Sequence, residues 1–142
     1  DLAHLRALSQ RIPAGFRLAR MDMALAQRVQ ADLQTEDHVH FFGSPEYFLE
    51  KGIGYCALEG ERIVSAASSG AACRKGSEVQ INTHADYRQR GLATCVGAAL
   101  LTHCLEHGLE PHWCTGNPIS VNLAKKLGYT VKDIGYIWVR VA

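Results

Sequence analysis

The hydrophobic repeat of this chain changes abruptly near its centre, and that change limits the folds it can adopt. Residues 78–83 alternate polar and apolar side chains, with Val79 and Ile81 on one face, as in a strand. From Ala93 to Cys104 the apolar residues recur every three or four positions, as along one side of a helix. The pattern predicts a strand followed directly by an amphipathic helix whose apolar stripe packs on that strand.

The turn between these two elements, residues 87–93, reads Tyr-Arg-Gln-Arg-Gly-Leu-Ala. Gly91 allows another group to approach the backbone closely, and the first N–H groups of the new helix have no partner within it. A turn of this kind can bind an anion such as a pyrophosphate. A solvated turn with a glycine before the helix would use the same residues, so both interpretations stay open on this segment alone.

The rest of the chain continues the alternation of strands and helices, which predicts the α/β class in one domain over residues 1–142. Helices are expected at 23–33, 44–51, 90–107 and 117–127, and strands at 15–20, 53–58, 62–69, 111–115, 129–131 and 136–141. Gly60 and Glu61 predict a hairpin turn, and residues 34–43 a loop. Residues 1–13 are expected to be an N-terminal extension that ends a preceding region, with the core at about 14–142.

Composition argues against several kinds of partner. The formal net charge is +1, so no overall field directs the chain to nucleic acid or to a membrane surface. No apolar run approaches the roughly 20 residues that span a bilayer. No Cys-x-x-Cys pair or Cys/His cluster of zinc spacing is present, so no metal site is expected. The five cysteines are expected to be mostly buried, reduced thiols of a cytoplasmic protein: Cys56, Cys73, Cys95, Cys104 and Cys114.

Two motifs in a fixed order give the chain a resemblance to a known family. Arg88, Gly91 and Ala93 have the spacing (Arg/Gln)-x-x-Gly-x-(Gly/Ala), and Asn117 opens a segment that ends in Leu-Gly-Tyr at residues 127–129. Together they resemble the GNAT superfamily of acyl-CoA-dependent N-acetyltransferases. Segments 44–56 and 111–128 are most similar to the subgroup that includes the zwittermicin A resistance acetyltransferase. The resemblance implies a splayed mixed sheet flanked by helices, and a chain that is the C-terminal catalytic domain of a longer protein.

The resemblance also implies acetyl-CoA as acyl donor and a set of residues that bind it. In this family, backbone N–H groups of the turn hold the pyrophosphate, and the splayed end of the preceding strand binds the pantetheine arm. Asn117 is also a helix cap by its position, and the Ser120 hydroxyl could instead bond its own helix backbone. The expected donor-binding residues are Ile81, Asn82, Thr83, Arg88, Gln89, Arg90, Gly91, Leu92, Ala93, Thr94, Asn117 and Ser120.

A base is expected near the thioester, because only a neutral amine is nucleophilic. Glu78, at the start of the signature strand, and His112, on the fifth expected strand, are the two candidates for this catalytic role. An ordinary surface position is the alternative for each. His84, His38 and His40 are weaker candidates.

Ala124 is a departure from the family pattern, in which many members carry a tyrosine general acid at that position. Tyr129, Tyr136 and Cys114 could replace it, and the sequence assigns none of them. A thiolate with a pKa near ~8.5 can be protonated by water, so activity does not require the tyrosine.

These observations predict an acetyl-CoA-dependent N-acetyltransferase that acts on a primary amine by direct attack in a ternary complex, without a covalent enzyme intermediate. A non-catalytic acyl-CoA sensor, favoured by Ala124, and an interaction domain without cofactor are the alternatives. The sequence does not distinguish a small-molecule acceptor from a peptide amine. Residues 34–43 indicate only a mixed polar and aromatic pocket wall, and a homodimer stays open.

Overall fold

The computed structural model describes residues 1–72 and 74–130. In this part of the chain the helices are α1 (Leu2–Ser9), α2 (Met23–Leu33), α3 (Pro45–Lys51), α4 (Leu92–Glu106) and α5 (Pro118–Lys126), with 3-10 turns η1 (His40–Phe42) and η2 (Ala85–Tyr87). The strands are β1 (Arg17–Arg20), β2 (Gly54–Glu59), β3 (Arg62–Ala72), β4 (Gly76–Thr83) and β5 (Glu110–His112).

The described strands form one mixed sheet in the order β1-β2-β3-β4-β5. Strands β1 to β4 pair with one another in antiparallel fashion, whereas β5 runs parallel to β4. Parallel neighbours need a long crossover connection, and α4 provides it. The predicted strand and the helix that follows it are therefore β4 and α4, and α4 carries the chain across to β5.

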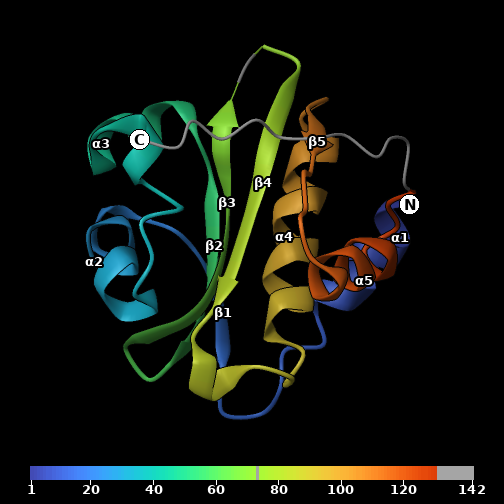
Figure 1. The fold of residues 1–142 in the computed structure, drawn as a ribbon, viewed down its shortest axis with the longest axis horizontal. Helices are drawn as coiled ribbons and strands as arrows, with labels where there is room; N and C mark the ends of the chain where they lie inside the picture. Colours follow the sequence, from blue (N-terminus) through green and yellow to red (C-terminus); the bar gives the residue numbers. More distant parts are fainter. Residues whose placement is uncertain (73, 131–142) are drawn as a thin grey trace.

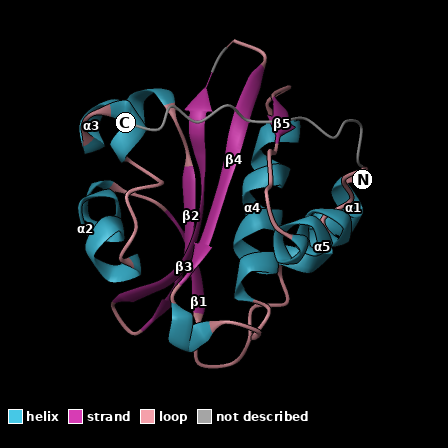
Figure 2. Cartoon of the chain, in the orientation of Figure 1, coloured by secondary structure: helices cyan, strands magenta, loops and turns pink. Residues whose placement is uncertain are grey.

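Helices cover both faces of the sheet (Figures 1 and 2). On one face, α2 and α3 bury a cluster that includes Leu25, Val29 and Phe48 against the strands. On the other, α1, α4 and α5 bury a second cluster with Val79 and Leu100. This arrangement confirms the predicted α/β class with a mixed sheet flanked by helices.

Helix α4 approaches the sheet closely because position 97 is a glycine. A Cβ atom added to Gly97 would lie 2.9 Å from Ile81 Cδ1 and 2.9 Å from Leu127 Cδ1. A larger residue here would push α4 away from β4 and α5, since packed interiors have little spare space. Gly97 therefore fixes the spacing between the three elements that surround the candidate site.

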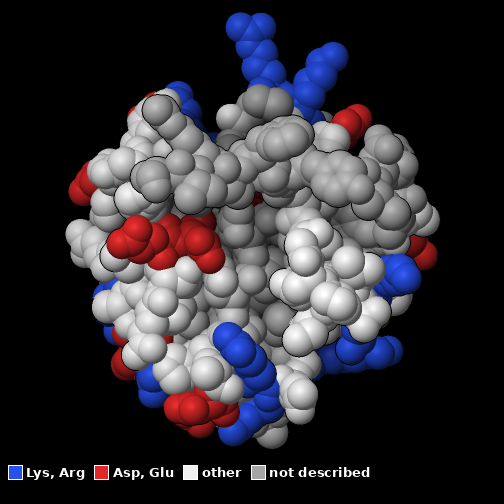
Figure 3. All heavy atoms as spheres, in the orientation of Figure 1, with Lys and Arg blue, Asp and Glu red and all other residues white. Residues whose placement is uncertain are grey.

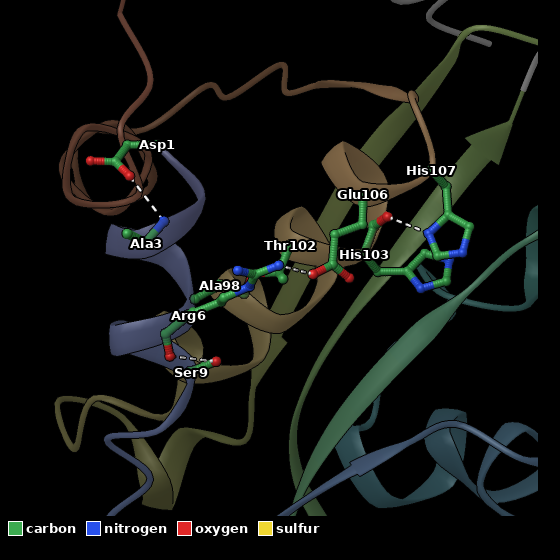
Figure 4. Close-up of polar contacts among 9 residues, drawn as sticks. All are labelled: Asp1, Ala3, Arg6, Ser9, Ala98, Thr102, His103, Glu106 and His107. Carbon is green, nitrogen blue, oxygen red and sulfur yellow. Dashed lines mark hydrogen bonds and ion pairs between the residues drawn. The ribbon is translucent and has the colours of Figure 1, made fainter.

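Helix α1 packs along α4 and contributes Leu5 and Leu8 to the core. Figure 4 shows the polar contacts that flank this packing: Arg6 Nη2 lies 2.6 Å from Glu106 Oε1, and the Asp1 carboxylate caps α1 by accepting from the Ala3 N–H. Both Arg6 and Glu106 are exposed, so their ion pair adds little to stability. The apolar contact of Leu5 and Leu8 is what attaches α1 to the domain.

Most predicted elements are present, and the differences lie at their ends. The predicted caps are confirmed: Ser44 Oγ accepts from the Tyr47 N–H, and Asn117 Oδ1 accepts from the Ser120 N–H at 2.9 Å. The strand expected at 111–115 is instead Glu110–His112, and the loop at 34–43 contains the η1 turn. Tyr129 is not in a strand, and the rest of the two final predicted strands lies outside the described residues.

The expectation that the cysteines are mostly buried holds for three of the four described ones. Cys56, Cys95 and Cys104 are buried, free thiols, whereas Cys114 is exposed. Cys114 lies beyond the end of β5, so it is not covered by the sheet. Among the helices of residues 1–72 and 74–130, none has both the length and the apolar character needed to cross a membrane.

Candidate functional site

Strand β4 separates from β5 soon after it begins. Their parallel register covers residues 76–78 opposite residues 110–112, and no β5 partner follows Glu78 in the described chain. Figure 1 shows β5 beside the first part of β4 only. On the other side, β4 stays paired with β3 as far as Thr83. The unpaired edge of β4 therefore presents backbone groups to an extended chain laid along it.

The turn that follows β4 has an unusual backbone. Gln89 and Gly91 both adopt the left-handed conformation, with φ of 60° and 82°. Such φ values are uncommon for a residue other than glycine. Where residues in right-handed and left-handed backbone conformations alternate, their N–H groups can form a concave site that binds an anion. A Cβ atom added to Gly91 would meet nothing within 4 Å, so the turn faces open space.

Helix α4 begins at this turn without a side-chain cap. Its N-cap residue is Gly91, and no side chain accepts a hydrogen bond from the first turn in the described structure. The helix continues for 15 residues, so the positive end of its dipole also lies here. Leu92 and Thr94 point into the protein, which leaves only their backbone for an anion. The turn has the donors and the field that a pyrophosphate requires.

Two arginines lie at the turn, of which Arg88 is a position of the signature. Arg88 Nε donates to the Thr83 carbonyl at 3.4 Å, and Arg90 Nη2 donates to the Asp86 carbonyl at 3.1 Å. The Arg90 guanidinium also lies over the Tyr87 ring, 5.0 Å from its centroid. Both arginines are exposed. Their positively charged side chains can therefore interact with an anion that is bound to the backbone of the turn.

The side chains of residues 81–83 each make a contact within the protein. Ile81 packs in the core against α4, and Thr83 Oγ1 bonds Ser65 Oγ at 2.8 Å. Asn82 Nδ2 donates to Asp37 Oδ2 at 3.1 Å. The Asn82 Oδ1 atom is buried with no hydrogen-bond partner in the described structure. Apart from that atom, these contacts leave only the backbone groups of the three residues to a ligand laid along the strand.

Asn117 and Ser120 begin α5. The side-chain oxygen of Asn117 caps this helix, which agrees with the cap expected from its position. The Asn117 side chain is exposed. Ser120 is half-buried on the first turn of the helix. Leu127, which directly follows α5, packs next to Gly97 of α4. Both residues thus lie on an element that packs beside the signature helix.

The two candidate bases are direct neighbours across the sheet. Glu78 on β4 and His112 on β5 are Cα partners in the last pair before these strands separate. Glu78 Oε1 accepts from the Cys114 N–H at 3.1 Å, whereas the exposed His112 lies 3.7 Å from Glu110 Oε2. The structure therefore brings both candidates together at the point where β4 becomes open.

The three weaker histidine candidates have structural partners. His38 is 1% exposed, and its Nδ1 lies 2.6 Å from Ser68 Oγ. Burial lowers the pKa of His38 to about 4, although the neighbouring Asp37 opposes that shift. His84 bonds Arg62 at 3.1 Å, and His40 is exposed, 3.9 Å from Glu36.

The substitutes considered for the missing tyrosine acid differ in position. The Tyr129 hydroxyl donates to the Pro111 carbonyl at 3.0 Å, next to His112, and burial raises its pKa. The pKa of Cys114 is also raised, chiefly by the Glu78 carboxylate. Ala124 is buried in α5, and Tyr136 lies outside the described residues.

Two further features were not anticipated from the sequence. His103 and His107 stack with ring centroids 4.0 Å apart at the end of α4 (Figure 4). Their i, i+4 spacing is a two-histidine metal motif that the expectation of no metal site overlooked. Residues 1–72 and 74–130 contain no group of three metal-ligating side chains. The second feature is a cavity of about 430 Å³ beside α3.

The chain matches the GNAT acetyltransferase family over residues 1–136. It is 32% identical over 120 residues to the uncharacterized N-acetyltransferase YdfB of Bacillus subtilis, a match that covers 83% of this chain and 46% of that protein. It resembles the crystal structure of a GCN5-related N-acetyltransferase-like protein from Streptococcus suis with a TM-score of 0.89 and 35% identity, over 94% of this chain and 53% of that one.

A more distant similarity is to AAC(6')-Iy in complex with the bisubstrate analog CoA-S-monomethyl-acetylneamine, with a TM-score of 0.70 over 91% of this chain and 100% of that one. At 15% identity it shows the fold alone. The chain spans about half the length of the Bacillus and Streptococcus proteins. The signature turn, the separated strands and the family match over residues 1–136 together lead to one conclusion: the chain belongs to the GNAT acetyltransferase family.

Proposed function

We propose that this domain binds acetyl-CoA and transfers its acetyl group to a primary amine by direct attack in a ternary complex. The observation that carries the proposal is that an open strand edge is followed directly along the chain by an anion-binding turn. The open edge of β4, beyond Glu78, leads directly to the uncapped start of α4 with Gln89 and Gly91 in left-handed conformations. An extended arm that ends in a pyrophosphate fits an unpaired strand edge followed by an anion-binding turn.

The donor would bind mainly through backbone groups. The N–H groups of residues 89–94 would hold the pyrophosphate, with Arg88 and Arg90 adding charge from the exposed side of the turn. Backbone groups of Ile81, Asn82 and Thr83 would hydrogen-bond the pantetheine arm, since their side chains each make a contact within the protein. A strand N–H near the thioester carbonyl would stabilise the oxyanion that forms as the amine attacks.

The general base would be Glu78 or His112, which lie side by side where β4 and β5 separate. Glu78 and His112 lie on adjacent strands, and either can take a proton from the amine directly or through one water molecule. The amine nitrogen bonds to the acetyl carbon, the bond to sulfur breaks, and CoA leaves as a thiolate. With a pKa near ~8.5, that thiolate can take a proton from water, so Ala124 does not prevent turnover.

The motifs around Ser44 and Asn117 support a finer assignment within the family. They resemble the subgroup of the zwittermicin A resistance acetyltransferase. Members of that subgroup usually carry an additional N-terminal region before this catalytic part. The proposal accordingly takes the chain as the acetyltransferase part of a longer protein.

Release of free CoA thiol tests the proposal. The domain is mixed with acetyl-CoA and a broad panel of primary amines, and thiol is measured with and without each amine. Amine-dependent release with formation of the N-acetyl product is expected. Acetyl-CoA binding without release for any amine would contradict the catalytic proposal.

A non-catalytic acyl-CoA sensor is the second candidate, and Ala124 favours it. The position where many members have their tyrosine acid holds a buried methyl group here. A sensor would bind acetyl-CoA and release no thiol, so the same experiment separates the two functions.

A further inference from the structure

We propose that the acceptor is a primary amine that also carries an anionic group and a bulky apolar group, as a hydrophobic amino acid does. It would bind in the cavity beside α3. This inference rests on the proposed function and names the substrate class of that same site. The cavity has a volume of about 430 Å³ and is lined by Phe41, Phe42, Tyr47, Lys51, Gly70, Ala72 and Arg74.

The cavity lies beside the strand that carries the candidate base. Gly70 forms part of its wall, and a Cβ atom added there would lie 2.6 Å from Gln80 Cγ on β4. Side chains alternate along a strand, so Glu78 and Gln80 lie on the same face of β4. Ser69 pairs with Val79 and Ala71 with Glu78, which makes Gly70 a bulge opposite this segment. Gln80 therefore lies next to the cavity wall, and Glu78 is the neighbouring residue on the same face of β4.

The aromatic residues of the wall favour an apolar group. Phe42 packs edge-on against the buried Phe48, with centroids 5.2 Å apart, and this contact holds its ring in place. Phe41 and Tyr47 are 66% and 49% exposed, which leaves much of their apolar surface in water. Covering such rings with a ligand removes that surface from water and is favourable. A wall of this kind selects a ligand with a bulky apolar side chain.

The charged residues of the wall favour an anion. Lys51 and Arg74 are cations, and no carboxylate is among the lining residues in the described chain. Glu50 lies 2.8 Å from Lys51 Nζ at the surface and offsets part of that charge, so Arg74, which has no ion pair in the described chain, is the stronger attraction for an anion. A polycationic amine would place like charges against both side chains, whereas a carboxylate or phosphate would be attracted.

The attraction is local rather than a property of the whole surface. The chain carries a net charge of only +1, and Figure 3 shows basic and acidic side chains in separate small groups on the described part of one face. A pair of cations beside an aromatic wall therefore acts on ligands that enter the cavity, and it does not draw anions to the molecule in general.

Binding and turnover of three matched amines test the inference. L-Phenylalanine, L-phenylalaninamide and spermidine are titrated into the domain by calorimetry in the presence of CoA, and the same compounds are tested for thiol release with acetyl-CoA. We expect L-phenylalanine to bind at least 10-fold more tightly than its amide and spermidine not to bind. Equal binding of the acid and the amide, or preference for spermidine, would overturn the inference.

Variants that remove a positive charge test whether Lys51 and Arg74 are the residues that bind the carboxylate of the ligand. Lys51→Gln together with Arg74→Gln should weaken L-phenylalanine binding at least 10-fold and leave binding of the amide unchanged. Lys75→Gln, which removes an adjacent charge outside the cavity wall, should change neither. If the double variant binds the acid as the unchanged domain does, the inference is wrong. Selective binding of the acid without thiol release would instead contradict the proposed catalysis and leave the pocket assignment standing.

Discussion

At the scale of single residues, His38 shows how burial controls a titratable group. Its imidazole is 1% exposed and bonds Ser68, and burial lowers its pKa from 6.5 to about 4. The unfolded chain therefore takes up this proton at a higher pH than the folded one. The neutral, buried ring therefore makes its full contribution to the free energy of unfolding above pH 6.5, and this contribution is lost as the pH falls from 6.5 towards 4.

Replacing His38 should flatten that dependence. Between pH 7 and pH 5 the free energy of unfolding of the unchanged domain should fall by about 2 kcal/mol more than that of His38→Gln. Urea unfolding at the two pH values measures the difference. The exposed His40 provides the control, since His40→Gln should keep the original slope. An unchanged slope in His38→Gln would show that His38 is not the group responsible.

The choice between Glu78 and His112 as base also belongs to single residues. If Glu78 acts as the base, Glu78→Gln should lower kcat on the order of 10²-fold, because the amide cannot accept the proton. His112→Gln should then reduce kcat only slightly, and the reverse result would assign the base to His112. Acetyl-CoA affinity, measured in parallel, should stay the same in both variants, since neither side chain belongs to the anion-binding turn.

The limits of the sequence are clear at the same scale. The spacing around Gly91 indicated the turn, but nothing marked Gln89 as left-handed, because this conformation depends on the surrounding structure rather than on residue type. Cys114 was expected in a strand and is exposed. Its N–H bonds the Glu78 carboxylate at 3.1 Å, in a segment beyond the end of β5.

At the scale of elements, periodicity predicted the helices well and the strand ends less well. The apolar stripes and side-chain caps of α2, α3 and α5 act over short distances, so they are visible in the sequence. Helix α4 has no side-chain cap and is buried continuously from residue 94 to residue 101, so the predicted one-sided apolar stripe describes it less well. The β3–β4 hairpin extends past its predicted ends, where small residues from Gly70 to Ala72 give no alternation. Strand pairing depends on partners distant in sequence, which a local pattern does not reveal.

Helix α1 provides a test of how far the domain extends. Leu5 is 2% exposed and packs with α4, although the segment was expected to be an extension outside the core. Leu5→Ala should lower the free energy of unfolding by about 2–5 kcal/mol because it leaves a cavity in this packing. Leu2→Ala, at a half-buried position of the same helix, should cost less. Urea unfolding compares the two variants. A negligible effect of Leu5→Ala would show that the packing of α1 on α4 does not contribute to the stability of the domain.

At the scale of the whole molecule, the two halves of the proposed reaction lie at different parts of one strand. The donor end is the turn after β4, where α4 begins, and the proposed acceptor cavity adjoins the first half of β4 on the face covered by α3. Of the two candidate bases, Glu78 lies in the same first half of β4, and His112 is its partner on β5, where the two strands separate. This geometry suits direct transfer between two bound substrates, since the donor arm and the amine can meet without a carrier residue.

Acetyl-CoA binding by two glycine variants tests the central claim, that the turn at Gly91 binds the donor. Gly91 and Gly108 both have positive φ, 82° and 67°, at opposite ends of α4, and a Cβ atom at either would meet nothing within 4 Å. Valine at either position should therefore cost a similar amount of stability, about 1–3 kcal/mol. Calorimetric titration should show that Gly91→Val weakens acetyl-CoA binding at least 10-fold while Gly108→Val binds as the unchanged domain does. Equal affinity in all three proteins would contradict the account.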